Sequence, residues 1–176
     1  SVKVNGSETN NGWIDNGNGV YSSNLSFDTD GVYTVSVSCT DKADNQGNTI
    51  NDQEFVIDKT VPNLEITNIQ DLSANKEPVA PEITCNDTNI DLSNVTYKLE
   101  GSQNGEKKTD ENIIDNNTSK TIKFNTIDTD DNYTLTALAT DKAGNKVEKK
   151  VSFSVNQNGS VITFLSGDIN KKYINK

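Results

Sequence analysis

The chain has 176 residues, a formal net charge of -10 and no histidine. The acidic balance leaves no basic footprint for nucleic acid, and the missing histidine excludes Ser-His or Cys-His nucleophile pairs and histidine metal sites. Only 31% of the residues are hydrophobic, no apolar run is long enough to span a membrane, and no carboxylate pair accompanies an aromatic cleft, so we expect neither membrane insertion nor catalysis.

Short alternating apolar runs, separated by Asn and Gly turns, predict strands in the first sixty residues. Residues 10–19 form a loop rich in Asn-Gly pairs, which tight turns favour. Trp13 lies in this loop and has two interpretations. We prefer a core plug beneath the loop, and the alternative is an exposed ring that stacks on a sugar or a protein. The expected strands are residues 1–6, 20–27, 33–40 and 54–58.

One passage occurs twice, a hundred positions apart, at residues 27–46 and 127–146. Ten of the twenty aligned positions are identical, including the D-T-D entry, the tyrosine and the T-D-K-A-x-N exit. A repeat of this fidelity indicates tandem copies of one structural unit. We therefore expect three segments: an incomplete module at 1–58, a module at 59–157, and a tail or the start of a further module at 158–176.

The second copy contains enough strands for an antiparallel sandwich, at the spacing typical of that fold. Residues 1–6 align with the third of these strands, so the first copy lacks counterparts of the two front strands. In the tail, residues 161–165 are apolar; we read them as part of a third module, or else as a strand that pairs with the exposed edge of a neighbouring copy. The expected strands are residues 63–69, 79–86, 94–100, 120–127, 133–140 and 147–156, with a weak strand around 113–114.

The two cysteines, Cys39 and Cys85, fall in different copies of the repeat. Strand alternation points both side chains inward, and the position that matches Cys39 in the second copy is Ala139. We expect both thiols to be free and buried, because free cysteine behaves as a small hydrophobic residue.

Two resemblances follow from the repeat. The segment D-x-D-G-x-Y resembles the tyrosine corner of immunoglobulin-like sandwiches, and Tyr33 and Tyr133 would carry that role. The pattern Y-T-[VL]-x-[VA]-x-x-T-D-K-A-[DG]-N, with a closing strand and D-K-T-x-P, resembles the bacterial immunoglobulin-like modules found in tandem on secreted and cell-wall-anchored proteins of Gram-positive bacteria.

That resemblance implies an all-β fold of tandem immunoglobulin-like antiparallel β-sandwiches, the first lacking its front strands. It also implies an extracellular or cell-wall location, neighbouring modules of the same parent chain as partners, and a role as a spacer or stalk that displays other domains. The alternative is an adhesin or carbohydrate-binding module that uses the Trp13 loop or residues 101–119 to bind a host or glycan ligand. A third reading is a module with an internal Lys-Asn isopeptide bond, although no trio of residues for it is identifiable.

Calcium is the one cofactor that the sequence suggests. Aspartates gather in loops at the ends of the repeated strand, and hard oxygen ligands in flexible loops suit Ca²⁺. The spacing does not complete a recognised twelve-residue calcium loop, and the preferred alternative is that these side chains shape the corner and the following turn through bonds to the backbone. The residues concerned are Asp28, Asp30 and Asp41 in the first copy and Asp128, Asp130, Asp131 and Asp141 in the second.

Overall fold

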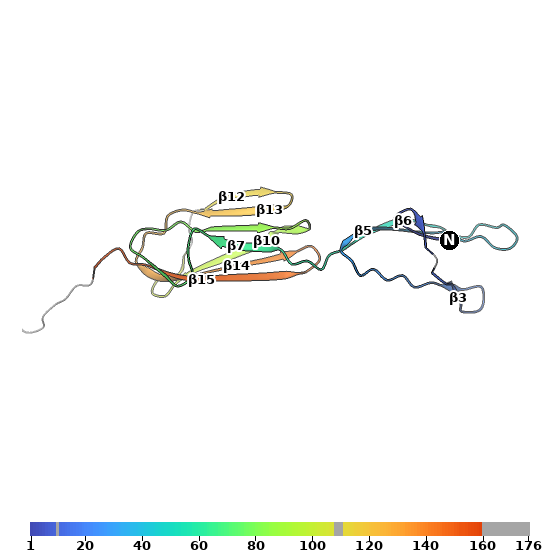
Figure 1. Ribbon diagram of the computed structural model, residues 1–176, viewed down its shortest axis with the longest axis horizontal. Helices are drawn as coiled ribbons and strands as arrows, with labels where there is room; N and C mark the ends of the chain where they lie inside the picture. Colours follow the sequence, from blue (N-terminus) through green and yellow to red (C-terminus); the bar gives the residue numbers. More distant parts are fainter. Residues whose placement is uncertain (10, 108–110, 160–176) are drawn as a thin grey trace, which may run out of the picture.

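The computed structural model describes residues 1–9, 11–107 and 111–159. These residues form strands and turns without a helix, so none of them belongs to a helix that could cross a membrane. The prediction of an all-β, antiparallel fold is confirmed. The strands fall into an N-terminal unit (residues 1–57) and a C-terminal sandwich (residues 63–155), which lie end to end and are joined by a short connection (Figure 1).

The N-terminal unit consists of one four-stranded sheet and a small hairpin. The sheet has the order β2-β1-β5-β6, and β3 and β4 form the hairpin. β5 carries the alternating segment of the repeat and pairs antiparallel with β6, opposing Tyr33 to Phe55. The strands are β1 (Val2–Val4), β2 (Ser7–Glu8), β3 (Ile14–Asp15), β4 (Tyr21–Ser22), β5 (Gly31–Val37) and β6 (Ile50–Ile57).

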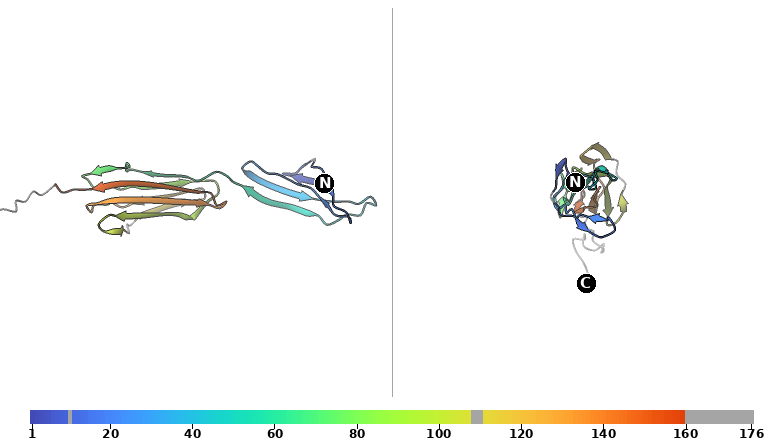
Figure 2. Two further views of the ribbon diagram at one scale, coloured as in Figure 1. Left: turned by 90° about the horizontal axis from the view of Figure 1, so that it is seen from below. Right: turned by 90° about the vertical axis from the view of Figure 1, so that its right-hand side faces the viewer.

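The C-terminal sandwich has two facing sheets, in the orders β11-β10-β14-β15-β8 and β12-β13-β9-β7. In both units the strands run along the long axis of the molecule (Figure 2). The strands are β7 (Asn63–Thr67), β8 (Ser73–Asn75), β9 (Glu82–Asn86), β10 (Ile90–Gly101), β11 (Gly105–Lys107), β12 (Glu111–Asn116), β13 (Ser119–Phe124), β14 (Asp131–Asp141) and β15 (Lys146–Val155).

The core of the sandwich lies between its two sheets and follows the period-two alternation of the strands. Along β14 every second residue from Tyr133 to Ala139 is at most 1% exposed. These side chains meet apolar residues from the opposite sheet. The buried residues of this core are Leu64, Ile83, Cys85, Ile90, Val95, Leu99, Ile122, Phe124, Ile127, Tyr133, Leu135, Ala137, Ala139, Phe153 and Val155.

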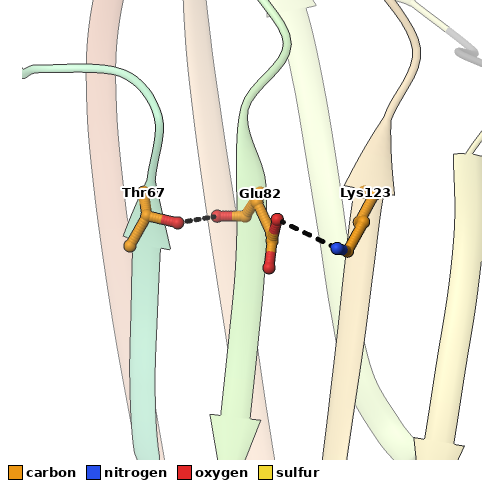
Figure 3. Close-up of polar contacts among 3 residues, drawn as sticks. All are labelled: Thr67, Glu82 and Lys123. Atoms are coloured by element: carbon orange, nitrogen blue, oxygen red, sulfur yellow. Dashed lines mark hydrogen bonds and ion pairs between the residues drawn. The ribbon is translucent and has the colours of Figure 1, made fainter.

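Polar side chains also connect neighbouring strands of the second sheet. Glu82 on β9 lies between β7 and β13: its carbonyl oxygen accepts a bond from Thr67 Oγ1 at 3.4 Å, and its carboxylate lies 3.7 Å from Lys123 Nζ (Figure 3). The Lys123 side chain is about half exposed. An ion pair of this kind contributes at most about 1 kcal/mol. Burial of apolar side chains, rather than this ion pair, therefore supplies most of the stability of the sheet.

The structure departs from the sequence predictions at several places. Cys39 was expected to be buried but is exposed, because no described strand covers it as the opposite sheet covers Ala139; Cys85 is buried as expected. The strand expected at residues 20–27 is reduced to Tyr21–Ser22. The short strand β8 was not predicted, because it is polar and pairs with β15 through its backbone.

Candidate functional site

The D-T-D motif holds the chain where it leaves the N-terminal unit. Asp30 accepts two bonds through its carboxylate, one from the Lys59 amide at 3.0 Å and one from Thr60 Oγ1 at 2.6 Å. Lys59 Nζ also donates to the carbonyl oxygen of Asp28 at 2.7 Å. The bond from Thr60 is the main reason that the pKa of Asp30 lies below its ordinary value. We call this set of contacts the exit clamp.

The second copy builds the same exit clamp with different partners. Asp130 accepts bonds from the Gln157 amide at 2.9 Å and from Asn158 Nδ2 at 2.8 Å. Gln157 Nε2 donates to the carbonyl oxygen of Asp128, as Lys59 does to Asp28 in the first copy. These bonds, the Gln157 amide first, hold the pKa of Asp130 below its ordinary value. The repeated motif therefore fixes the segment that follows the last strand of each copy.

The D-K-A-x-N motif builds the turn between the repeated strand and the next one. Asp41 accepts bonds from the amides of Ala43 and Asn45 at 2.8 and 2.9 Å, and from Asn45 Nδ2 at 2.8 Å. Asp141 accepts the amide and Nδ2 of Asn145, both at 2.8 Å. Bonds from side chain to backbone within a few residues stabilise such turns. The bonds from Asn45, its side chain first, lower the pKa of Asp41.

The connection between the units is bonded to the C-terminal sandwich as well. Asn89 Nδ2 donates to the Asp58 carboxylate at 2.7 Å, and Asn145 Nδ2 donates to the Asp58 carbonyl oxygen at 3.1 Å. Pro62, which has a fixed φ, is fully buried directly before β7. Hydrogen bonds therefore hold the linker to Asp30 of the N-terminal unit and to Asn89 and Asn145 of the C-terminal sandwich.

Three carboxylates meet at this junction. Asp58 comes from the linker, Asp87 follows β9 and Asp141 ends β14, and their oxygen atoms lie within 4.8 Å of one another. Hard oxygen donors at this spacing suit a divalent cation chemically. Among the residues that the structure describes, this is the one such group. It includes Asp141 of the predicted calcium set and leaves out Asp28, Asp30, Asp41, Asp128, Asp130 and Asp131, so calcium binding stays a prediction.

Asp131 was considered from the sequence as a candidate calcium ligand, and the structure shows it bonded within the protein. It is 5% exposed, and its carboxylate holds the turn between β10 and β11. Burial raises the pKa of this carboxyl, but the bonds that it accepts outweigh burial and bring the pKa to about 2. The repeat contained a signal for a special role, because the second copy has an aspartate at the position where the first copy has Gly31. Its donors are Ser102 Oγ, Asn104 Nδ2 and the amides of Gln103, Asn104 and Asn132.

Both repeat tyrosines make the backward hydrogen bond expected of a tyrosine corner. Tyr33 Oη donates to the Thr29 carbonyl oxygen at 2.9 Å, and Tyr133 Oη donates to that of Thr129 at 2.7 Å. Tyr133 is 1% exposed, and burial is the main cause of its raised pKa. Each ring packs on the phenylalanine of the following strand, at 5.7 Å for Phe55 and 5.4 Å for Phe153.

The two predicted ligand-binding loops differ in the surface that they present. Trp13 is 46% exposed, so the preferred interpretation of a core plug is wrong. Residues of the 101–119 segment line a cleft of about 660 Å³ between β10 and the β12–β13 hairpin. Its lining mixes apolar side chains such as Tyr97 and Ile113 with both signs of charge.

Comparison with known proteins agrees with this architecture. A search of curated proteins found no match to the chain. The family model described as "Bacterial Ig-like domain (group 3)" matches residues 17–162, most of the chain. It matches them as one stretch that runs through the junction, so it includes the repeated strand of both copies. The chain therefore belongs to the bacterial Ig-like domain family.

Proposed function

We propose that the chain is a non-catalytic spacer of a large secreted or cell-wall-anchored protein of a Gram-positive bacterium, in which it displays other domains away from the cell. Bacterial Ig-like domains are a non-enzymatic fold family and commonly occur in extracellular or surface proteins. That membership supports both the non-catalytic role and the extracellular location. The partners are neighbouring modules of the same parent chain.

The repeated exit clamp is the observation that carries this proposal. In each copy an aspartate of the D-T-D motif bonds the segment that leaves the last strand. A spacer keeps its two ends far apart only when successive units keep a fixed direction relative to each other. A flexible linker would let the units fold back on each other. The chain enters and leaves the sandwich at opposite ends (Figure 1), so clamped exits extend the molecule along one axis.

Small-angle X-ray scattering tests the spacer proposal with a matched pair of variants. Asp30→Ala removes the carboxylate that accepts bonds from Lys59 and Thr60. Asp28→Ala removes a neighbouring carboxylate whose side chain bonds only Ser26 among the described residues. We expect wild type and Asp28→Ala to share one extended profile and Asp30→Ala to show a smaller radius of gyration. A compact wild type, or equal effects of the two substitutions, would refute the proposal.

A binding module is the second candidate, favoured by the exposed hairpin of the N-terminal unit. Trp13 lies beside Ile14 on β3, and Val20 and Tyr21 on the other arm are more than half exposed. An aromatic surface of this kind can stack on a sugar ring or on a host protein. A glycan array probed with wild type and Trp13→Ala distinguishes the candidates: binding that is lost on substitution supports the module and contradicts a pure spacer.

A further inference from the structure

One side of the C-terminal sandwich ends in a strand that has no partner on its outer edge. β12 pairs with β13 residue by residue from Glu111 to Asn116, without a bulge. It is the last strand of its sheet, so no other described strand pairs with its outer edge. β12 and β13 form the outer margin of the sandwich in Figure 1. The backbone groups along the outer edge of β12 are therefore open to an added strand.

The residues of β12 favour pairing with another molecule. Natural edge strands are often protected by Lys, by Pro or by a bulge, and the sequence of β12, ENIIDN, contains neither residue type. Its centre carries two isoleucines instead, Ile113 and Ile114, which are 48% and 51% exposed. Neighbouring residues of a strand point to opposite faces of the sheet. An added strand would therefore cover apolar surface on both faces of this edge.

The sequence of β12 is complementary to itself in one register. Residues directly opposite each other in an antiparallel pair point to the same face of the sheet, so two copies related by a two-fold axis must pair about one central residue. Pairing about Ile113 would oppose Glu111 to Asp115, and like charges directly opposite each other are destabilising. Pairing about Ile114 opposes Ile113 to Asp115 instead. No two carboxylates are then opposite each other, so the strand fits a second copy of itself about Ile114.

The charges around this edge also permit a second copy to approach. The whole chain has a net charge of -10, which opposes self-association in general. The β12–β13 hairpin is balanced, because Glu111 and Asp115 on β12 are matched by Lys120 and Lys123 on β13. Lys120 is directly opposite Asp115 in this hairpin. This side of the sandwich therefore lacks the charge excess of the rest of the chain.

We propose that β12 is an adhesive edge at which two copies of this chain pair antiparallel about Ile114. In this register the two Ile114 side chains are opposite each other, and Asn112 of each copy is opposite Asn116 of the other. Asparagine side chains both donate and accept hydrogen bonds, so these pairs can bond across the interface. The contact is isologous, and it closes at a dimer.

The orientation of the strands determines where the second copy comes from. The strands of the sandwich run along the long axis of the molecule (Figure 2), so antiparallel strands place the two molecules antiparallel. Copies anchored on one cell point the same way, whereas copies on facing cells point in opposite directions. The partner is therefore a copy on a neighbouring cell, an inference that rests on the proposed role as a surface spacer. A single pair of short strands binds weakly, and many copies on each surface supply the avidity.

Sedimentation velocity on the full chain tests the pairing with charges placed at its centre. Ile114→Asp and Ile114→Lys each put like charges opposite each other, so we expect both variants to stay monomeric at concentrations where the wild type doubles its mass. An equimolar mixture of the two variants should restore the dimer, because opposite charges then face each other. Leu72→Asp is the control, since it puts the same charge on a leucine that is 82% exposed beside β8, and it should dimerise like the wild type.

The mixture keeps the test independent of folding, because two variants that fail to fold cannot restore each other. A wild type that is monomeric at every concentration overturns the proposal, and so does a mixture that stays monomeric. Restoration by the same two charges at Ile113 rather than at Ile114 overturns the register.

Beads that carry the chain by its C-terminus test the origin of the partner. We expect wild-type beads to clump, and beads with Ile114→Asp and beads with Ile114→Lys to clump only when the two are mixed. A wild type that dimerises in solution but leaves its beads dispersed overturns contact between facing surfaces. Small-angle scattering of the Ile114→Asp monomer separates this failure from that of the spacer: an extended profile retains the spacer, and a compact one refutes it.

Discussion

Leu135 offers the sharpest test of the packing described for the sandwich. It is 0% exposed on β14, so Leu135→Ala removes about three buried carbon groups, each contributing about 0.8 kcal/mol. The cavity left behind adds a further term, and buried Leu→Ala changes cost about 2.7–5 kcal/mol. We expect a loss of about 3–4 kcal/mol from the free energy of unfolding of the sandwich. The matched change Val35→Ala removes about two groups at a half-buried site and should cost about 1 kcal/mol or less.

Urea denaturation can separate these two effects, because Trp13 is the single tryptophan and lies in the N-terminal unit. Its fluorescence reports that unit, and far-UV circular dichroism reports both. Leu135→Ala should lower the transition seen by circular dichroism and leave the fluorescence transition in place, whereas Val35→Ala should move only the latter. The reasoning fails if Leu135→Ala costs less than about 1 kcal/mol or shifts both transitions equally.

Three further predictions concern the corner, the buried carboxylate and the junction. Tyr133→Phe should lower the free energy of unfolding by about 1 kcal/mol, because one buried hydrogen bond is lost; an unchanged urea midpoint would contradict this. The folded-state pKa of Asp131, about 2, lies below its ordinary value of 3.8, so its stabilisation is present above about pH 4 and is lost as pH falls toward 2. Urea midpoints measured from pH 7 to 2 should fall more steeply for wild type than for Asp131→Asn, and parallel curves would refute this. Calcium binding by Asp58, Asp87 and Asp141 predicts a higher Tm with millimolar Ca²⁺ than with chelator, and Asp87→Asn should abolish the shift; equal Tm values in wild type would exclude it.

The sequence predicted most of the sandwich because its strands alternate cleanly and are bounded by turn residues. The segment from Tyr133 to Ala139 alternates between a buried and a polar face, and the structure places it at the centre of a sheet. The repeat also located the corner and turn motifs. The alternation of apolar and polar residues predicts these strands well because one face of each strand is buried, and this burial fixes the register of the strand pairs.

The wrong predictions have a common physical cause. Whether a side chain is buried depends on the residues that pack over it, and these lie far away in the chain. Cys39 has the pattern of a buried residue, but burial requires an opposite layer that no described strand provides. Trp13 is likewise exposed, to 46%, in the part of the chain that the structure describes. β8 has no apolar alternation at all and forms because Leu72 and Asn75 bond the backbone around β15.

The junction could not be predicted for a similar reason. Asp58, Asp87 and Asp141 come from a linker and two strand ends that are separated by tens of residues. Their oxygen atoms come together only because the two sheets that contain β9 and β14 face each other in the sandwich. The exit clamp is different, because both of its aspartates lie in the repeat, yet their partners Lys59 and Gln157 are not alike in sequence.

A fixed direction between the two units is the central claim, and a spin-label distance measurement tests it most directly. One label is attached to exposed Cys39 and the other to Lys149→Cys on β15, in dilute protein. Cys85 does not compete, because burial raises the pKa of its thiol to about 11. We predict a single narrow distance distribution that broadens when Asp30→Ala releases the exit clamp. A broad distribution in the wild type, or a width that Asp30→Ala leaves unchanged, would contradict the claim.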